Sequence, residues 1–348
     1  MKILLVGEFS GVHNNLKKGL TELGHEVKLA ADGDGFKKFE YDFPITPYGG
    51  LYFGRVLNLI YILLNIRKFI GYDVIQFISP FSIPTYLFKI GLLEFIFRRN
   101  KKIIYYACGT DPNYERVSKS LDYHPNNGRK YYTPRRLKYH NWFINRVDTI
   151  VPATYTYYLG YKGKNSLAKS IMLPGSGIYI NEVKKPRKKI KILFGITRRD
   201  FKGAVYIEEA LGMIKQKYES RVDIKIVERM PFEDYIKLLD ETDILIDQCK
   251  SYFYGMNAIF AMERGVIVLS GAEETAVKYY GIENIPIINI KPNSEQIFIE
   301  LKRLIEMSDN KIYKLKIESL SYVRNFHGIK KINIEFEKIY KTLVTRSI

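Results

Sequence analysis

Three basic side chains follow an apolar stretch in the second half of the chain. Residues Ile190–Gly195 predict a buried strand, and a helical pattern begins at Ala204. Arg198, Arg199 and Lys202 stand between the two. Such a turn brings cationic side chains and free backbone N–H groups together, and arginine grips phosphate oxygens as a fork while lysine adds a compact charge. The turn therefore predicts a pyrophosphate site, with a solvated basic turn as the alternative.

A second strand-to-helix junction lies further along the same half of the chain. Asp243–Asp247 predicts a strand, and Gly255 opens another helical pattern eight residues after Asp247. Open α/β sheets bind ligands where the carboxyl ends of such strands meet. We therefore expect this junction and the basic turn at the same edge of one sheet.

The order and spacing of these segments resemble the nucleotide-sugar half of a GT-B glycosyltransferase, most of all the retaining family 4 type. The resemblance covers nearly the whole chain in architecture, but its specific motifs, IKILFGITRRDFKG and SYFYGMNAIFAMERG, lie in the second half. It implies that Arg198 or Arg199, together with Lys202, holds the donor diphosphate. It also implies an α/β fold of two Rossmann-like parallel-sheet domains that face each other across a cleft.

The resemblance also assigns residues around the helix that Gly255 opens. In the family, the beginning of this helix faces the donor phosphates and sugar. We therefore expect donor contacts from Tyr254, Gly255, Met256 and Asn257, and we count Glu228 with them.

Two positions depart from the family pattern. The family carries one glutamate on the donor sugar and one on the ribose, and here Tyr252 and Phe260 stand in their places. Neither side chain accepts two hydroxyl hydrogen bonds as a carboxylate does. Glu263, one helical turn after Phe260, would replace the second glutamate only if the helix were rotated. The departure puts the donor-sugar contacts in question, but not the fold.

In the first half, the sequence GEFSGVH at Gly7–His13 leaves the first predicted strand and opens a helix. The backbone N–H groups of Ser10, Gly11 and Val12 are placed to meet an anion there. By resemblance, this loop lies beside the donor phosphates and the acceptor. Gly11 becomes a donor-binding candidate and His13 a catalytic one, with a capping or surface histidine as the alternative for His13.

A further loop, CGTDP, follows the predicted strand Lys102–Ala107. Related sequences often read HGSD or HGTD there, so Cys108 replaces a histidine that faces the reacting centre, while Gly109–Asp111 keep the pattern. Asp111 is then the carboxylate that contacts acceptor hydroxyls or acts as a base. Its structural alternative is to cap the next turn, ahead of Pro112.

The segment Tyr114–Tyr139 is rich in tyrosine and basic residues. Aromatic faces stack on sugars and arginines grip phosphates, which suits a glycan or a lipid-linked pyrophosphate acceptor. An exposed loop of ordinary composition is the alternative.

The sequence Asp32-Gly33-Asp34 spells the DxD that binds a metal in the other glycosyltransferase fold. Here it lies in a DGDG turn, where aspartate and glycine are good turn formers. Because the basic turn supplies the charge neutralisation that a metal would provide, we expect no metal or other cofactor.

The composition is that of an ordinary globular protein with excess positive charge. Hydrophobic residues make up 46% of the chain, and the net charge is +18. Two apolar helical patterns end in the basic clusters Ile66–Lys68 and Arg98–Lys102, which suits an anionic bilayer surface. Core helices with solvated ends are the alternative. No nucleic-acid-binding pattern accompanies the charge, so nucleic acid is not an expected partner.

The cysteine content and the N-terminus bear on where the protein works. Cys108 and Cys249 lie far apart without metal-ligand spacing, which indicates a reducing, cytoplasmic setting. Met1 leads directly into a predicted strand, and no apolar run reaches the roughly 18 residues of a spanning helix. We expect a cytoplasmic protein whose only membrane association would be peripheral, on the inner face of the cell membrane.

Strands alternate with helical patterns throughout, which predicts parallel sheets with helical crossovers. We expect an N-terminal acceptor domain at 1–173, a linker at 174–189 and a C-terminal donor domain at 190–328. By resemblance, the last helical pattern, at 329–348, crosses back to the first domain.

These patterns predict a hexosyltransferase that uses a nucleoside-diphosphate sugar to extend a glycan or lipid-linked acceptor in cell-surface polysaccharide biosynthesis, such as capsule or lipopolysaccharide. Retention of configuration is implied by resemblance only. A nucleotide-sugar 2-epimerase shares the fold but depends on carboxylates and histidines that are scarce here. The other rival is a non-catalytic GT-B homologue that binds a nucleotide or glycan as the partner of another transferase; Tyr252, Phe260 and Cys108 favour it.

Overall fold

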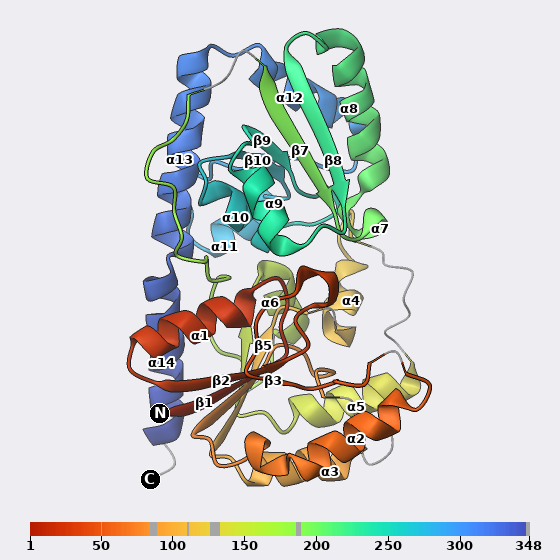
Figure 1. The fold of residues 1–348 in the computed structure, drawn as a ribbon, viewed down its shortest axis with the longest axis vertical. Coiled ribbons are helices and arrows are strands. Elements are labelled where there is room, and N and C mark those ends of the chain that lie inside the picture. Colours follow the sequence, from red (N-terminus) through yellow and green to blue (C-terminus); the bar gives the residue numbers. More distant parts are fainter. Residues whose placement is uncertain (50, 84–88, 110, 126–132, 186–188, 346–348) are drawn as a thin grey trace. The chain divides into compact units, whose positions relative to one another are not determined.

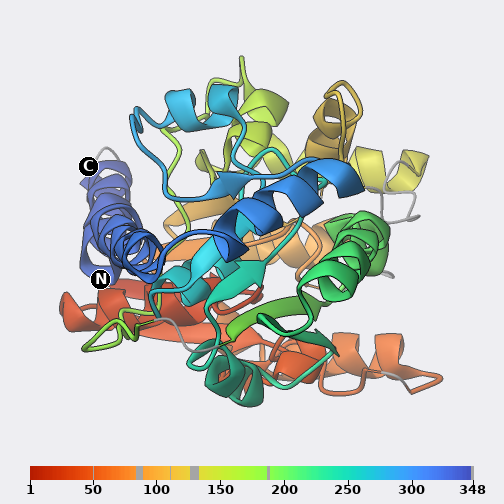
Figure 2. The ribbon, with the colours of Figure 1, turned by 90° about the horizontal axis from the view of Figure 1, so that it is seen from above.

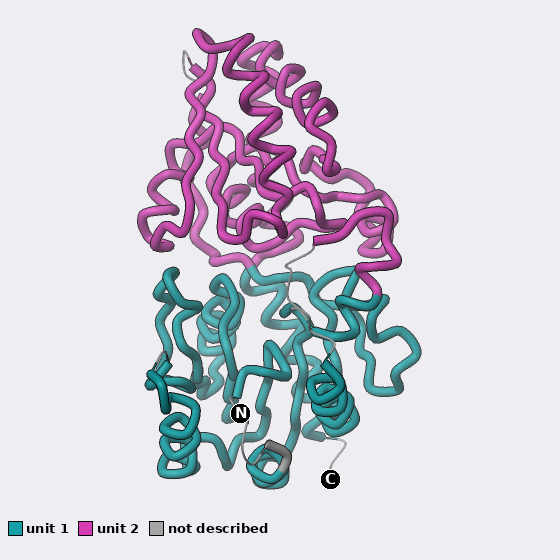
Figure 3. Tube along the Cα trace, turned by 90° about the vertical axis from the view of Figure 1, so that its right-hand side faces the viewer, with its two compact units in different colours: residues 1–116, 130–174, 329–348 teal, residues 117–129, 175–328 magenta. Residues whose placement is uncertain are grey.

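The computed structural model describes the chain except for residues 50, 84–88, 110, 126–132, 186–188 and 346–348. The chain divides into two compact units, drawn in teal and magenta in Figure 3. Unit 1 comprises residues 1–116, 130–174 and 329–348, and unit 2 comprises residues 117–129 and 175–328.

Unit 1 is built on a six-stranded parallel sheet with the strand order β3-β2-β1-β4-β5-β6 (Figure 1). All four residues of β4 and all but the first of β1 are buried, because a parallel sheet covered on both faces needs apolar side chains on both. The strands are β1 (Lys2–Val6), β2 (Glu26–Ala31), β3 (Phe43–Pro44), β4 (Val74–Phe77), β5 (Lys102–Ala107) and β6 (Thr149–Pro152). The helices of this part are α1 (Val12–Glu22), α2 (Gly54–Leu64), α3 (Lys89–Arg98), α4 (Pro112–Ser118), α5 (Pro134–Ile144), α6 (Tyr155–Tyr161) and α14 (Ile329–Thr345).

The last helix of the chain, α14, belongs to unit 1 and packs against α1. Its Phe336 ring meets the Tyr106 ring edge-on at 4.9 Å. The hydroxyl of Tyr340, fully buried, donates to Gln76 Oε1 of β4 at 2.7 Å. Helix α14 therefore contributes to the core of unit 1.

Unit 2 is built on a five-stranded parallel sheet with the order β11-β10-β9-β7-β8. Its strands are β7 (Ile190–Ile196), β8 (Val222–Glu228), β9 (Ile244–Ile246), β10 (Ile267–Ser270) and β11 (Ile288–Asn289). Its helices are α7 (Arg199–Lys202), α8 (Ala204–Tyr218), α9 (Phe232–Leu239), α10 (Met256–Met262), α11 (Glu274–Tyr279), α12 (Ser294–Ile305) and α13 (Asp309–His327). α8 and α12 lie side by side, as Figures 1 and 2 show, and bury Ile207, Ile214, Leu301 and Leu304 in the core of this unit.

The predicted alternation of strands and helices is confirmed in both units. The helical pattern that ends in the basic cluster Ile66–Lys68 forms two elements, α2 and a 3-10 helix at Ile66–Phe69. They meet at Asn65, whose side chain donates to the carbonyl oxygen of Tyr61 at 2.9 Å and ends α2. Among the described residues, no helix is both long enough and apolar enough to cross a membrane.

Candidate functional site

The predicted basic turn begins where β7 ends and is held against the segment after β9. Gly203 joins α7 to α8 with a φ of 75°, a backbone conformation that favours glycine. A side chain at Gly203 would collide with Cys249 Sγ. The N–H group of Cys249 donates to the carbonyl oxygen of Lys202 at 3.0 Å. The position of Lys202 is therefore fixed by its neighbours on the sheet.

The three cations of this turn have different surroundings. Arg198 is exposed, and its guanidinium carbon lies 3.7 Å from the centre of the Phe201 ring. Within the described parts of the chain, Arg198 forms no ion pair within 4 Å. Arg199 is exposed and donates to Glu208. Only Lys202 is buried, with 6% of its surface exposed.

Lys202 lies in a cluster of polar side chains at the carboxyl ends of β7, β9 and β10. Its ammonium group is 3.0 Å from Asp247 Oδ1. Asn257 Nδ2 donates to the same oxygen at 2.9 Å, and the Ser270 hydroxyl donates to Asp247 Oδ2 at 3.1 Å. Asp247 is 2% exposed and orients the other three groups. Sequence reasoning identified Lys202 and Asn257 but missed Asp247 and Ser270; the signal for Asp247 was its place at the end of a predicted strand.

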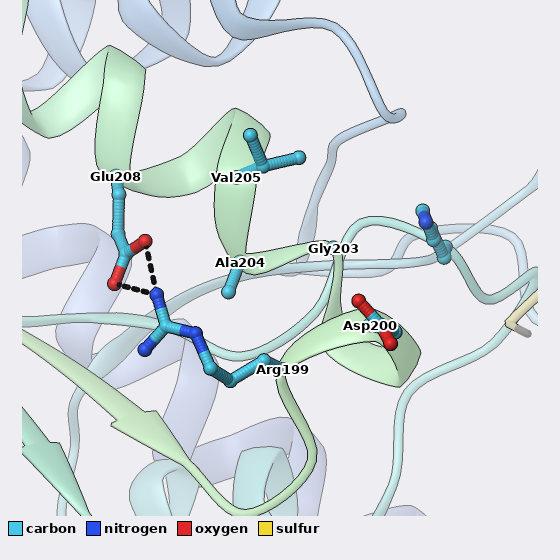
Figure 4. A pocket seen from close by; sticks show the side chains of 7 residues that line it. Arg199, Asp200, Gly203, Ala204, Val205 and Glu208 are labelled. Atoms are coloured by element: carbon cyan, nitrogen blue, oxygen red, sulfur yellow. Dashed lines mark hydrogen bonds and ion pairs between the residues drawn. The ribbon is translucent and has the colours of Figure 1, made fainter. Parts of the chain in front are cut away.

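Arg199 lines a pocket of about 390 Å³ beside this turn (Figure 4). In Figure 4 its guanidinium group points toward the carboxylate of Glu208. Glu228, at the end of β8, lies 3.5 Å from the other side of the guanidinium group. The walls of the pocket carry as many basic as acidic side chains, so they do not by themselves favour an anion. The lining residues are Arg199, Asp200, Gly203, Ala204, Val205, Glu208 and Lys250.

The four donor contacts predicted around Gly255 divide into two pairs. Tyr254 is 1% exposed, and its hydroxyl lies 2.6 Å from that of Tyr322 and 2.7 Å from His327 Nε2. Met256 is also buried. Both side chains are buried within unit 2, so we correct their assignment from donor binding to packing. Gly255, which has open space beside its Cα, and Asn257 remain candidates.

Glu263 does not replace the missing second glutamate. It is fully buried, accepts hydrogen bonds from the Ser176 hydroxyl at 2.6 Å and the Gly177 N–H at 3.1 Å, and so holds the segment that leads into unit 2. Burial raises the pKa of its carboxyl. Phe260 packs edge-on against Phe232 at 4.9 Å. The position that binds ribose in the family is thus part of the apolar core.

Part of the predicted acceptor segment lies in unit 2. The Tyr123 hydroxyl donates to Glu273 Oε1 at 2.6 Å, and its ring lies 5.0 Å from that of Tyr252. The Tyr252 hydroxyl donates in turn to Asp122 Oδ2 at 3.2 Å. Other members of the segment, Asn126, Arg129, Lys130, Tyr131 and Tyr132, lie outside the described residues, as does Thr110 of the CGTDP loop.

The loop after β1 is occupied by the carboxyl group of Glu8. Glu8 Oε2 accepts from the backbone and side-chain N–H groups of Asn14, both at 2.8 Å, in the first turn of α1. The Ser10 N–H donates to Asp34 Oδ2 at 2.8 Å, and the Val12 N–H to the Phe9 carbonyl. The expectation that Ser10 and Val12 offer free N–H groups is therefore wrong. Gly11 caps α1 with a φ of 83°, and its role as a donor contact stays a prediction.

His13 lies in the interior of unit 1 and not on its surface. The ring is fully buried; Nδ1 donates to the Gly7 carbonyl oxygen at 2.7 Å, and Nε2 accepts from Gln76 Nε2 at 3.2 Å. Gln76 accepts from Tyr340, so this chain of hydrogen bonds ties α1, β4 and α14 together. We therefore correct the assignment of His13 from a catalytic residue to a residue of the core of unit 1.

Asp111 is also buried and plays the capping role. Its Oδ1 accepts from the Tyr114 N–H at 2.8 Å in the first turn of α4. Its Oδ2 accepts from the hydroxyls of Tyr105 at 2.6 Å and Tyr161 at 2.7 Å. A carboxylate without exposed surface and with three donors does not reach an acceptor, so we reassign Asp111 from catalysis to structure. Cys108 beside it is half-buried, and burial raises the pKa of its thiol.

Asp32 and Asp34 of the DGDG turn are both engaged within unit 1. Asp32 accepts from the backbone N–H groups of Ile45 and Thr46, and Asp34 binds Ser10 and Lys37. Among the described residues there is no group of three or more histidine, cysteine, aspartate or glutamate side chains that could hold a metal ion.

The pKa shifts of Glu8 and His13 have opposite effects on how the stability of the fold depends on pH. Burial raises the pKa of Glu8 from 4.5 to about 7 and lowers that of His13 from 6.5 to about 3. A carboxyl with a raised pKa stabilises the fold fully below pH 4.5 and loses this contribution as pH rises to 7. The contribution of a histidine with a lowered pKa is complete above pH 6.5 and falls as pH decreases. Between pH 4.5 and 6.5 the two slopes cancel.

In the Glu8→Gln variant, we expect the free energy of unfolding to show the pH dependence that His13 causes. From pH 6.5 to 4.5 its free energy of unfolding should fall by about 1.4 kcal/mol per pH unit relative to wild type, roughly 3 kcal/mol in all. His13→Gln should show the opposite slope. Urea unfolding followed by the fluorescence of Trp142, the only tryptophan, reports on unit 1. Parallel pH profiles for wild type and Glu8→Gln would show that the Glu8 carboxyl titrates normally.

No family model matches the sequence, and no curated protein does. Solved structures match it over nearly its whole length. HepE from Anabaena, in a structure with UDP and glucose, is 12% identical; the match covers 98% of this chain and 100% of that chain with a TM-score of 0.66. Sucrose-phosphate synthase from Thermosynechococcus elongatus is 13% identical, with coverage of 99% and 100% and a TM-score of 0.67. WaaG, a glycosyltransferase involved in lipopolysaccharide biosynthesis, is 12% identical, with 99% coverage of each chain and a TM-score of 0.62.

At this level of identity the matches establish the fold. The sheet of each unit is parallel throughout, with helices between the strands. Together with the matches over nearly the whole chain, these sheets show that the protein has the two-domain α/β fold of the GT-B glycosyltransferases.

Proposed function

We propose that this chain is a glycosyltransferase that moves a sugar from a nucleoside-diphosphate sugar to a glycan or lipid-linked acceptor. The observation that carries the proposal is the Lys202–Asp247–Asn257 cluster, which fixes an ammonium group at the carboxyl ends of β7 and β9 of a GT-B fold. Open α/β sheets bind ligands at this edge. HepE, which shares the fold, has been solved with UDP and with UDP-glucose.

In this proposal the basic turn stabilises the charge that develops on the leaving diphosphate. A lysine ammonium group has three N–H donors, and among the described side chains only Asp247 accepts from Lys202. Two donors therefore remain for phosphate oxygens. Arg198 supplies a second, exposed cation. The other donor contacts that we propose are Arg199, Glu228, Gly255 and Asn257. Of these, Arg199 and Glu228 already form an ion pair with each other.

The finer features of the proposal have separate support. Retention of configuration and hexosyl transfer rest on the resemblance of the motifs to the retaining family. Independence from metals rests on the cations of the turn, which take over the charge neutralisation. A role in cell-surface polysaccharide biosynthesis, as for capsule or lipopolysaccharide, is supported by the likeness to WaaG. We place the protein in the cytoplasm, at an anionic membrane surface, because of its net charge of +18.

The test is a calorimetric titration of the protein with UDP, GDP, dTDP, ADP and CMP. One nucleotide should bind best, and Arg198→Ala should weaken it roughly ten- to a hundredfold, because a hydrogen bond between two charged groups is lost. Lys215→Ala removes one charge from an exposed position of α8 and serves as the matched control, with unchanged affinity expected. Equal affinity of the Arg198 variant and the control would exclude Arg198 from the donor site.

The second candidate is a non-catalytic GT-B homologue that binds a nucleotide or glycan as the partner of another transferase. Phe260 favours it, because a buried aromatic ring occupies the position where the family binds ribose. In the same titration, a folded protein that binds none of the five nucleotides would support this candidate. Sugar transfer from a nucleotide sugar would exclude it.

A further inference from the structure

Unit 1 exposes an unusual amount of apolar surface along α2 and the turn before it. Tyr52 is 94% exposed, Leu64 81%, Phe53 67% and Leu51 58%. Large hydrophobic side chains that are exposed singly are common, but a run of them along one element marks an interaction site. The exposed members of the run are Tyr48, Leu51, Tyr52, Phe53, Val56, Ile60, Leu63 and Leu64, which we call the α2 face.

The helix itself is apolar on both sides. Asn58, Leu59 and Ile62 are buried and pack toward the core of unit 1. Val56, Ile60 and the pair Leu63–Leu64 recur at helical spacing on the side that is left exposed. A surface helix normally carries polar residues there. Figures 1 and 2 both show α2 at the outer edge of unit 1, in keeping with the exposure of these side chains.

The charge around the α2 face is of one sign. Residues 43–72 contain no aspartate or glutamate, whereas Arg55, Arg67 and Lys68 are all exposed in this stretch. Arg67 and Lys68 lie in the 3-10 helix that directly follows α2. A surface that is apolar along the helix, with aromatic side chains at one end and basic side chains at both ends, matches the interface of a bilayer with acidic lipids. A self-association face or an ordinary protein partner does not require this exclusion of acidic residues.

We propose that the α2 face docks unit 1 on the surface of an anionic lipid bilayer. Its eleven-residue helix is far shorter than the roughly 20 residues needed to span, so it lies in the plane of the interface. Tyr52, Phe53 and Leu64 enter the head-group region, and Arg67 and Lys68 contact acidic head groups. The face lies within unit 1, whereas the basic turn lies in unit 2, so docking is separable from donor binding.

The experiment is co-sedimentation of the full chain with vesicles of phosphatidylcholine alone and of phosphatidylcholine mixed with phosphatidylglycerol. Wild type should bind the mixed vesicles, and less tightly at high salt because the head-group attraction is screened. The double variant Tyr52→Ser/Leu64→Ser should bind them roughly ten- to a hundredfold more weakly, because it loses two inserted side chains. Arg67→Gln/Lys68→Gln should weaken binding to mixed vesicles about fivefold per residue and should change binding to neutral vesicles little.

Ile178→Ser/Ile299→Ser is the matched control, since both residues are well exposed apolar positions of unit 2. It should bind mixed vesicles like wild type. A Tyr52→Trp variant gives a direct signal of insertion, a shift of its emission to shorter wavelength when mixed vesicles are added.

Three results would overturn the proposal: equal vesicle binding by wild type and Tyr52→Ser/Leu64→Ser, no binding of wild type to mixed vesicles, or a Tyr52→Trp emission that vesicles leave unchanged. If wild type instead forms dimers that Tyr52→Ser/Leu64→Ser abolishes, the occupant is a second copy of the chain. Nucleotide titration of the same variant separates the two proposals. Unchanged nucleotide affinity with lost vesicle binding supports the docking face.

Discussion

Replacing Lys202 by alanine should destabilise unit 2 by about 3–5 kcal/mol and lower sugar transfer by several orders of magnitude. The change removes the ammonium group 3.0 Å from Asp247 and leaves a carboxylate that is 2% exposed. Among the described residues no other cation lies within 4 Å of it. A buried charge without its partner carries this cost. The loss of transfer follows from the proposed contact with the leaving diphosphate. Urea unfolding followed by circular dichroism, and initial rates with the nucleotide sugar that binds, measure the two effects.

Because alanine at this position disturbs both folding and binding, a second variant has to separate them. Lys202→Met together with Asp247→Asn removes both buried charges and keeps the approximate volume of each side chain. The asparagine oxygen still accepts from Asn257. Replacing a buried ion pair by neutral groups is often close to neutral for stability, so the double variant should recover most of the lost free energy of unfolding. Transfer should remain as low as in Lys202→Ala.

Two outcomes would contradict this account. Restored transfer in the double variant would mean that Lys202 is only a structural partner of Asp247. Wild-type stability of Lys202→Ala would mean that water reaches Asp247 and that the cluster is not closed. The first outcome would remove the proposed contact of Lys202 with the diphosphate and leave Arg198 as the cation of the site. The second would remove only the predicted cost of leaving Asp247 unpaired.

The fold could be predicted because most of the longer elements have a recognisable local sequence pattern. A continuous apolar run such as Ile190–Gly195 predicts a strand buried on both faces, and the periodic apolar pattern after Ala204 predicts a helix. The short strand β3 and the helices α4 and α6 give weaker signals, since they contain only two to seven residues. The parallel crossovers of this fold class restrict the possible strand orders, and the structure shows which order each sheet has.

The partners of the candidate residues could not be predicted from sequence. Asp247 and Lys202 are 45 residues apart, and only the pairing of β7 with β9 brings them together. His13 and Asp111 stand after strands, where functional residues gather, but their direction depends on the backbone. The φ of 86° at Gly7 and the start of α4 at Pro112 turn these side chains inward. A sequence shows that a polar residue lies at a sheet edge, not which way its side chain points.

Asp111→Ala should cost unit 1 roughly 4 kcal/mol of unfolding free energy, because three hydrogen bonds to one buried carboxylate are lost. The tyrosines remain donors at neutral pH, since burial and the Asp111 charge raise the pKa values of Tyr105 and Tyr161. His140 Nε2, 3.0 Å from the Tyr161 oxygen, donates to it and extends the chain of bonds. The alanine variant leaves these groups without an acceptor. Asp111→Asn keeps the hydrogen bond from the Tyr114 N–H group, so its free energy of unfolding should fall by about half as much.

Tyr105→Phe and Tyr161→Phe are the matched variants, because each removes one donor and leaves the ring in place. Each should cost about 1–2 kcal/mol. Trp142 packs on Phe97 at 5.8 Å in unit 1, so its fluorescence during urea unfolding measures all four changes. A catalytic base predicts the opposite pattern: Asp111→Asn would unfold like wild type and lose transfer by orders of magnitude. We expect instead that the folded fraction of Asp111→Asn, kept at low temperature, transfers sugar at a rate close to that of wild type, because the carboxylate holds α4 and does not meet the substrate.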